Sequence, residues 1–330
     1  MAQQTQNYYL GIDLGTTNSV ISWGNISRRQ KVLDPKVIEF PMMTEGRAMK
    51  NDALLPSYVY FSEDGPIVGE YAKTMIGRQT DQVVKSVKSY MGTPELFCFD
   101  GKNYEPAEIS AIILKQLAAG ARNVDIDVKQ VVITVPASFD SDQRSDTIQA
   151  GELAGFEVTL FDEPRAALYD FANRQEKGEI PSASIDFDSQ KLVLVFDLGG
   201  GTLDVSLHRV FYPDGEHELN IEDIAIGRYT RLGGDDFDKL LADHFLEAYS
   251  SRLPQNLSRY DLNLLESEFQ VYAEIAKINL SNTVFLKNQQ GIHNWRPEDI
   301  EEAIVRAPIV NPNHLFQYNL TLTEYEQTGS

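Results

Sequence analysis

The chain has 330 residues, of which 42% are hydrophobic and 24% are charged, an ordinary composition for a globular protein of one or two domains. Its formal net charge of −20 argues against binding to nucleic acid or to an anionic membrane surface, because both depend on Lys and Arg. A single cysteine excludes an internal disulfide framework and a cysteine cage for a metal ion.

The first half of the chain predicts strands that alternate with helices. Residues 8–23, YYLGIDLGTTNSVISW, read as a strand, a Gly/Thr-rich turn and a second strand. A strand at 57–61, a helix near 69–76 and an amphipathic helix from Pro106 are predicted next. A buried strand then stops at Pro136, and a helix follows over 140–154, with Asp140 and Gln143 as its cap and Gly155 as its end. The last two predicted elements are a strand at 157–161 and a helix with Pro164 in its first turn. This order describes an α/β lobe with helices packed on a mixed sheet.

The second half predicts another lobe, which is less complete. Residues 176–189 are polar and contain a glycine and a proline, so we expect a surface loop there. A second hairpin begins at Leu192, residues 231–253 read as a loop that leads into a helix, and a long helix covers about 262–280. The residues after it are less regular, and no final element is expected in TLTEYEQTGS.

The two hairpins share one design. Residues 195–207, VFDLGGGTLDVSL, repeat the pattern of the first hairpin, in which a buried-looking strand reaches Asp-Leu-Gly and turns through Gly and Thr residues into a second strand. Asp13 therefore corresponds to Asp197. A repeat at so long an interval indicates two related lobes and not a solenoid of short units.

Each hairpin loop predicts a phosphate-binding turn. Consecutive glycines let successive backbone amides face one point, which makes a concavity that binds anions, and Thr16, Thr17 and Thr202 add hydroxyl donors. A carboxylate beside a phosphate is repulsive unless a cation lies between them. Because Mg²⁺ keeps most of its waters, Asp13 and Asp197 are expected to hold a Mg²⁺–phosphate unit through water.

Two such loops facing each other would clamp a polyphosphate from both sides. The alternative is a pair of tight hairpins in unrelated sheets, and the matching position of the two aspartates disfavours it. The sequence has no G-x-x-x-x-G-K-[ST] and no G-x-G-x-x-G, so neither a P-loop nor a Rossmann dinucleotide site is expected.

Five motifs together resemble the ATPase domain of Hsp70 chaperones, over about Leu10 to Ser281: GIDLGTTNSV, VITVPASF, DEPRAALYDF, FDLGGGTLDVSL and LGGDDFD. The resemblance implies an α/β, two-lobed actin-like ATPase fold, in which each lobe is a ribonuclease-H-like mixed sheet with helices and the second lobe is incomplete. It also implies ATP or ADP with Mg²⁺ as the bound cofactors.

The resemblance further implies how the lobes divide. Lobe I is expected over 1–188, with an inner subdomain of about 1–38 and 116–188 and an outer one of about 39–115. Lobe II is expected over 189–330, with an inner subdomain of about 189–235, an outer one of about 236–322 and a truncated return segment after it.

The resemblance assigns catalytic roles to Lys73, Glu163, Asp197, Thr202 and Asp13. Lys73, in VGEYAK, is similar to the family's catalytic lysine, whose ammonium group neutralises charge near the γ-phosphate. Glu163 is similar to the acid that orients the attacking water or the hydrated Mg²⁺. Asp197 and Asp13 are similar to the magnesium acids, which act through water, and Asp197 is also a candidate base.

The nucleotide-binding residues implied by the resemblance are Gly15, Thr16, Thr17, Asn18, Gly199, Gly200, Gly201, Thr202, Asp204, Gly233, Gly234, Glu274, Lys277 and Ser281. In this set Thr202 and Asp204 would contact the γ-phosphate and the water, and Gly233, Gly234 and Asp235 form a turn on the phosphate side. Glu274, Lys277 and Ser281 would face the ribose and base from one side of a helix. Pro136 and Arg144 are similar to the proline switch and arginine relay that couple the nucleotide to the substrate domain.

Two features depart from the family pattern. Arg165 follows Glu-Pro, where the family usually has Thr, so a divergent member is expected. No G-G-S-x-R turn for the adenosine appears, and from this we expect a fragment of a longer protein with weakened ATP affinity.

The function expected from these features is that of an ATP-hydrolysing module of an Hsp70-like chaperone, which controls a polypeptide-binding domain absent from this chain. In the full protein the expected partners are a J-domain co-chaperone, a nucleotide exchange factor and unfolded polypeptide. The alternatives are an actin-like filament-forming ATPase, a sugar or acetate kinase, or a fragment unable to bind nucleotide. The first residues have no basic start or apolar run typical of a signal peptide, so a cytoplasmic location is expected.

Overall fold

The computed structural model describes residues 8–25, 34–44, 46, 48–126, 129–180, 185–213, 215, 218–228 and 230–328. The chain forms two compact units. Unit 1 comprises Met1–Lys73 and Val84–Leu232, and unit 2 comprises Thr74–Val83 and Gly233–Ser330. Both Asp-Leu-Gly hairpins therefore belong to unit 1.

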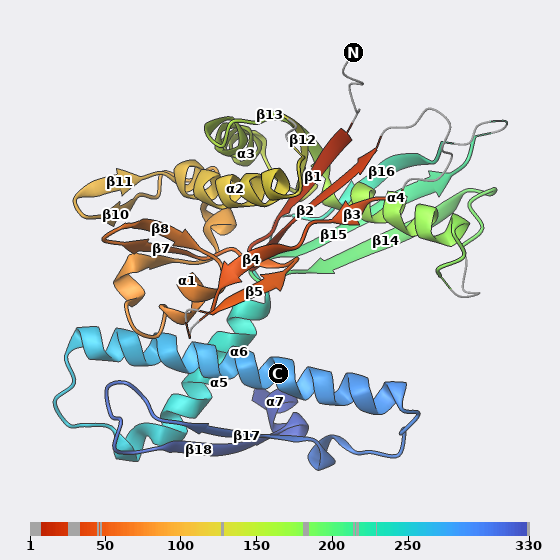
Figure 1. The fold of residues 1–330 in the computed structure, drawn as a ribbon. Coiled ribbons are helices and arrows are strands. Elements are labelled where there is room, and N and C mark those ends of the chain that lie inside the picture. The colour runs from red at the N-terminus through yellow and green to blue at the C-terminus, as the bar shows by residue number, and fades with distance from the viewer. Residues whose placement is uncertain are drawn as a thin grey trace. The chain divides into compact units, whose positions relative to one another are not determined.

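Unit 1 contains a mixed six-stranded sheet with the first hairpin at its centre (Figure 1). Its strands are β1 (Tyr8–Leu14), β2 (Asn18–Asn25), β3 (Lys36–Val37), β6 (Leu55–Pro56), β12 (Gln130–Val135) and β13 (Glu157–Asp162). The order is β13-β12-β1-β2-β3, and β6 also pairs with β2. β1 runs antiparallel to β2 and parallel to β12, which runs parallel to β13. Because side chains alternate along a strand, Leu10, Ile12 and Leu14 are buried in the core while Asp13 is exposed.

The helices α2, α3 and α4 of unit 1 begin where the sequence predicts. α2 (Pro106–Asn123) begins at Pro106, and the backbone N–H of Glu105 donates to the Glu108 carboxylate at 2.9 Å. α3 (Ser141–Leu153) is capped by Asp140, whose carboxylate accepts from the next amides of the first turn. Gly155 follows α3 with φ +93°, a conformation that favours glycine. α4 (Glu163–Glu176) begins directly after β13.

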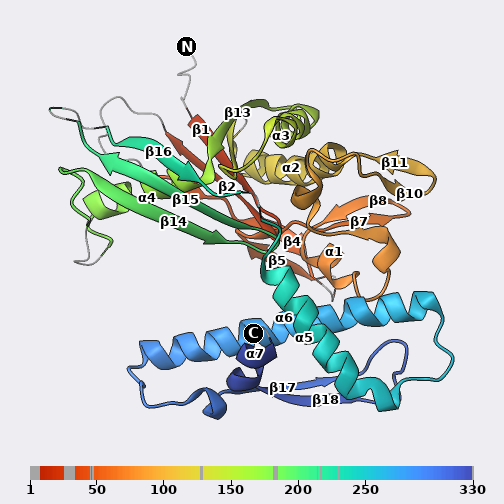
Figure 2. The same ribbon diagram turned by 180° about the vertical axis from the view of Figure 1, so that it is seen from behind.

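The second hairpin forms part of a separate antiparallel sheet in unit 1 (Figure 2). Its strands are β14 (Lys191–Leu198), β15 (Leu203–Phe211) and β16 (Asn220–Ile226), paired in that order. Helix α4 contacts β12 and β13, and its Leu168 packs in one buried cluster with Val210 and Ile221 of this sheet. α4 therefore contacts both sheets.

One face of β14 is exposed, although the sequence predicted a buried strand. Leu192, Leu194 and Phe196 are 66%, 62% and 62% exposed, although each is large and apolar. The intervening Val193 and Val195 are half-buried and pack beside α4. The strand is therefore covered on one face only.

The remaining elements of unit 1 are short. They are β4 (Phe40–Met43), β5 (Met49–Asp52), β7 (Val59–Ser62), β8 (Gly65–Val68), α1 (Glu70–Thr74), η2 (Val87–Tyr90), β10 (Phe97–Phe99) and β11 (Lys102–Tyr104). The two residues of β9 (Val83–Val84) divide between the units, and Thr74, the last residue of α1, belongs to unit 2. Helix α1 ends two residues earlier than the predicted helix near 69–76.

Unit 2 consists mainly of two helices and a hairpin. Its elements are η1 (Thr80–Gln82), α5 (Gly234–Tyr249), η3 (Ser250–Arg252), α6 (Arg259–Gln289), η4 (Pro297–Asp299), β17 (Glu301–Arg306), β18 (Phe316–Thr321) and α7 (Leu322–Thr328). Phe245, Phe269 and Phe316 meet in its core, with Phe269 and Phe316 ring centroids 4.9 Å apart.

Unit 2 also contains two corrections. α6 is longer than the predicted 262–280, because the Ser258 side chain caps it at the start by accepting from the Asp261 amide. The less regular end of the chain forms the β17–β18 hairpin, and TLTEYEQTGS contributes helix α7. Across the residues that the structure describes, no helix combines the length and the apolar character needed to cross a bilayer.

Candidate functional site

The two hairpin loops of unit 1 contact each other. An added Cβ at Gly200 would lie only 1.7 Å from Oγ1 of Thr17, and one at Gly201 would lie 2.9 Å from Cγ2 of Thr16. Both distances are shorter than any ordinary contact between such atoms. The glycines of the second loop are therefore needed for the close approach of the two loops.

Each loop is also closed by its own backbone. A Cβ at Gly15 would come within 2.1 Å of the Asn18 carbonyl oxygen, so only glycine fits this turn. In the second loop, the Gly199 N–H donates to the Thr202 carbonyl at 2.8 Å. Ser57, which sequence reasoning missed, supports the first loop because its hydroxyl donates to the Gly15 carbonyl at 2.8 Å.

One hydroxyl between the loops is unsatisfied. Thr17 Oγ1 is buried and has no hydrogen-bond partner among the described residues. Buried polar atoms are normally paired, so an unpaired hydroxyl beside two glycine loops fits a ligand with acceptor oxygens. Thr16 is buried, while Asn18 is exposed at the start of β2.

The acidic residues predicted from the two halves of the sequence gather around one lysine. Nζ of Lys88, in η2, lies 2.7 Å from Oε1 of Glu163, the first residue of α4. The two side chains are 9% and 18% exposed. Burial by itself would lower the pKa of Lys88, but Glu163, Asp13 and Asp204 raise it above its usual value. The lysine is therefore charged.

The same neighbours shift the acids. Burial raises the pKa of Glu163, which Asp13 and Asp197 raise further and Lys88 partly opposes. Burial and the adjacent Asp204 raise the pKa of Asp197, which pairs with Asp204 across β14 and β15. Asp13 and Asp197 thus share one electrostatic environment, and carboxylates outnumber cations in it.

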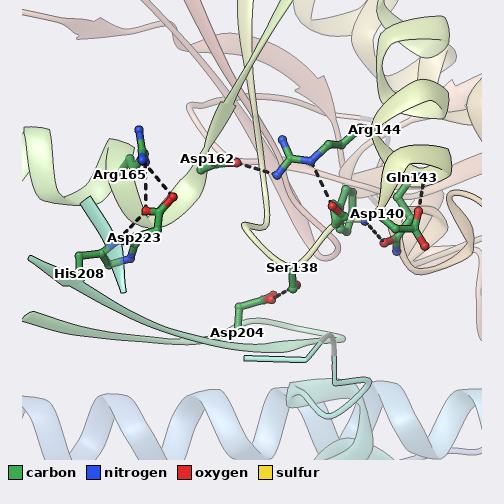
Figure 3. A network of polar contacts seen from close by, with 10 residues as sticks. Ser138, Asp140, Gln143, Arg144, Asp162, Arg165, Asp204, His208 and Asp223 are labelled. Atoms are coloured by element: carbon green, nitrogen blue, oxygen red, sulfur yellow. Dashed lines mark hydrogen bonds and ion pairs between the residues drawn. The ribbon is translucent and has the colours of Figure 1, made fainter. Parts of the chain in front are cut away.

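Asp204 is linked to the segment that follows β12. The Ser138 hydroxyl hydrogen-bonds the Asp204 carboxylate, and Figure 3 shows the two side chains pointing toward each other. Ser138, Glu163, Asp197 and Asp204 line a cavity of about 10 Å³, which is at the lower limit for a single water molecule. In the part of the chain that is described, no group of three or more His, Cys, Asp or Glu side chains is placed to hold a metal ion directly.

Arg144 connects three segments near this cavity. Its Nε donates to the carbonyl of Phe139 at 3.1 Å, three residues after Pro136. Its Nη2 lies 2.8 Å from Oδ1 of Asp162, which directly precedes Glu163 (Figure 3). Arg144 thus joins α3, the segment after Pro136 and the start of α4.

Arg165, in the first turn of α4, makes a different link. Its Nε and Nη2 donate to the two carboxylate oxygens of Asp223, in β16, at 3.3 and 2.9 Å (Figure 3). Nδ1 of the fully buried His208 lies 3.0 Å from the same carboxylate, and its Nε2 lies 2.7 Å from the Ser206 hydroxyl. A threonine at position 165 could not make this bidentate contact, because its side chain has a single hydroxyl donor.

Lys73, the predicted catalytic lysine, lies in helix α1. Its Nζ is 5.7 Å from the centre of the Tyr58 ring, and its amide donates to the Gly69 carbonyl at 3.0 Å. The lysine that contacts Glu163 is Lys88, which sequence reasoning missed because VVKSVKSY carries no local signal of burial.

The residues predicted for the nucleoside belong to unit 2. Glu274, Lys277 and Ser281 lie on α6, Gly234 is the first residue of α5, and Gly233 is its N-cap. Within unit 2, Lys277 links these helices, because its Nζ lies 2.7 Å from Oδ1 of Asp238 and 3.2 Å from the Gly234 carbonyl oxygen. Burial raises the pKa of Asp238 to about 6, although Lys277 opposes the rise.

Comparison with known proteins gives the family. The model of the Hsp70 protein family matches residues 9–97 and 96–310. The chaperone protein DnaK of Thermosipho africanus is 36% identical over 324 residues, which are 97% of this chain and 47% of that protein. The DnaK proteins of Thermotoga petrophila and Thermotoga maritima are each 38% identical over 285 residues, which are 84% of this chain and 42% of those proteins.

The chain therefore spans about half the length of the relatives it matches. Its mixed α/β structure with paired Asp-Leu-Gly hairpins is that of the actin-like ATPase fold, as predicted. The chain belongs to the Hsp70 family.

Proposed function

We propose that this chain is the ATP-binding and ATP-hydrolysing module of an Hsp70-like molecular chaperone. The observation that carries the proposal is the contact of Gly200 with Thr17, which brings the two glycine loops together beside Glu163 and Lys88. Family membership supports it independently.

The loops would hold the phosphates of ATP or ADP. Backbone amides of Gly15, Thr16 and Thr17 and of residues 200–202 would donate to phosphate oxygens, together with the unpaired Thr17 hydroxyl. The excess of carboxylates fits a cation, and Asp13 and Asp197 would hold Mg²⁺ through water. When bound, Mg²⁺ neutralises charge on the phosphate oxygens.

Hydrolysis needs a water molecule in line with the γ-phosphate. Glu163 would orient this water, and Asp197, whose pKa is raised by burial, would take a proton from it. The water oxygen would then form a bond to the γ-phosphorus as the bond from this phosphorus to the β–γ bridging oxygen breaks. Thr202 and Asp204 would contact the γ-phosphate and the water. Lys73 would stabilise the charge on the transferred group.

The other proposed roles extend beyond the phosphates. Glu274, Lys277 and Ser281 of α6, with Gly233 and Gly234, would serve the nucleoside side of the nucleotide. Pro136 and Arg144 would couple the nucleotide to a polypeptide-binding domain.

In the complete protein the proposed partners are unfolded polypeptide, a J-domain co-chaperone and a nucleotide exchange factor, in the cytoplasm. The family match disfavours the filament-forming ATPase and the sugar or acetate kinase. Sedimentation with Mg-ATP and a panel of sugar acceptors would detect those activities directly.

The proposal is tested by calorimetry and single-turnover hydrolysis on the purified chain. We expect the wild type to bind Mg-ATP and Mg-ADP, and Asp197→Asn to reduce the hydrolysis rate about a hundredfold or more. Asp188→Asn is the matched control, because Asp188 is exposed and lies in a turn before β14. No binding heat and no hydrolysis in the wild type, or equal rates in the two variants, would contradict the proposal.

A further inference from the structure

The ion pair between Lys88 and Glu163 is unusual in its burial. Lys88 is 7% exposed as a residue, and its Nζ also lies 5.8 Å from the centre of the Phe139 ring. A lysine is rarely buried to this extent, because removing an ammonium group from water is costly. The two partners are 75 residues apart in the sequence, so the pair joins distant segments.

The charges that face Lys88 come from several elements of unit 1. Glu163 is the first residue of α4, Asp13 is the second-last residue of β1 and Asp204 is the second residue of β15, and each stabilises the ammonium form. Glu163 in turn lines the small cavity that it shares with Asp197 and Asp204. The lysine is therefore placed beside the acids of the site, and it holds one of them directly.

We propose that Lys88 is a positioning residue, which fixes the Glu163 carboxylate toward the phosphate loops so that it can orient the attacking water. This inference rests on the proposed ATPase function. Lys88 acts through Glu163, since its ammonium group bonds Oε1 of that residue at 2.7 Å. A neutral side chain at position 88 leaves the carboxylate buried without its partner and free to turn.

Three single variants of the whole chain test this role. Lys88→Met removes the charge, Lys88→Arg keeps it, and Lys115→Met makes the same neutral change at an exposed lysine of α2. In Lys88→Met we expect single-turnover hydrolysis to fall about 10- to 100-fold, as for the loss of other residues that orient a catalytic group. The affinity for Mg-ATP should stay within about threefold, because only the chemical step is affected. Lys88→Arg should restore most of the rate, and Lys115→Met should match the wild type.

A double variant separates positioning from a merely structural ion pair. Thermal unfolding of the nucleotide-free chain should show that Lys88→Met is destabilising and that adding Glu163→Gln recovers much of the loss, because the unpaired buried charge is gone. Hydrolysis by the double variant should remain low. If Lys88→Met hydrolyses ATP at the wild-type rate per folded molecule, or if the double variant regains both stability and rate, the inference is overturned.

The failure of the proposed function has a different signature. If the wild-type chain neither binds nor hydrolyses Mg-ATP, both the ATPase proposal and the positioning role are wrong. The thermal unfolding of the single and double variants would still measure how much the ion pair contributes to stability. If Lys88→Met does not fold, the hydrolysis rates of Lys88→Arg and Glu163→Gln test the positioning role of Lys88. A hydrolysis rate that survives in Lys88→Arg and falls in Glu163→Gln supports the inference, and an unchanged rate in Glu163→Gln overturns it.

Discussion

Gly200→Ala is the substitution that most sharply probes the contact between the two loops. The new Cβ would lie 1.7 Å from Oγ1 and 3.0 Å from Cβ of Thr17, whereas non-bonded atoms pack at about 3.5 Å. The loops must therefore separate by roughly 2 Å, or the threonine must rotate away. Overpacking of this kind costs about 1–3 kcal/mol of folding free energy.

Two further variants make this prediction specific. Gly199→Ala changes the neighbouring residue of the same loop, but its Cβ would lie 3.5 Å from the nearest atom, the Thr202 carbonyl oxygen, which is an ordinary contact. Thr17→Ala in the Gly200→Ala background removes the clashing Oγ1. We expect Gly199→Ala to change stability by at most about 0.5 kcal/mol and Thr17→Ala to recover at least half of the loss.

The assay is urea unfolding of all four proteins, followed by calorimetry with Mg-ADP. Because 1.4 kcal/mol corresponds to a factor of about ten in affinity, Gly200→Ala should weaken Mg-ADP binding by about tenfold or more if both loops hold the phosphates. Equal stability and equal affinity of Gly200→Ala and Gly199→Ala would refute the reasoning, since the loops would then not touch in solution.

Two other predictions concern ion pairs. Arg165→Thr should lower the free energy of unfolding, measured in urea, by about 1 kcal/mol, because it removes a bidentate, partly exposed ion pair with Asp223. The control is Arg209→Thr, which removes a more exposed ion pair and should have almost no effect. An equal loss of stability in both variants would show that the contact with Asp223 adds nothing. Burial raises the pKa of Asp238 from 3.8 to about 6, so the folded chain binds an extra proton between these pH values and the free energy of unfolding falls as the pH rises from about 4 to about 6. Asp238→Asn should remove this part of the pH dependence, and identical slopes in wild type and variant would contradict the assignment.

Local signals in the sequence predicted most of the elements of unit 1. Asp140 and Gly155 predicted the ends of α3, and the segment that reaches Asp-Leu-Gly predicted the strand β1. These features depend on neighbouring residues only, so the sequence contains them. The repeated Asp-Leu-Gly pattern predicted that the two loops face each other, and the structure places Gly200 next to Thr17.

Features that depend on distant residues were missed. The apolar run of β14 predicted burial, but what covers each face of a strand is decided by other segments, and Leu194 is exposed. The alternation of Phe316, Tyr318 and Leu320 could have revealed the β17–β18 hairpin, since Phe316 and Leu320 are buried. The burial of Lys88 had no comparable signal, because it depends on a carboxylate 75 residues away.

If both loops bind one phosphate chain, backbone amide NMR of the chain titrated with Mg²⁺ and inorganic triphosphate will detect it. We expect the amides of residues 15–17 and of residues 199–202 to shift together, with one dissociation constant. Shifts confined to one loop, or separate dissociation constants for the two loops, would contradict it.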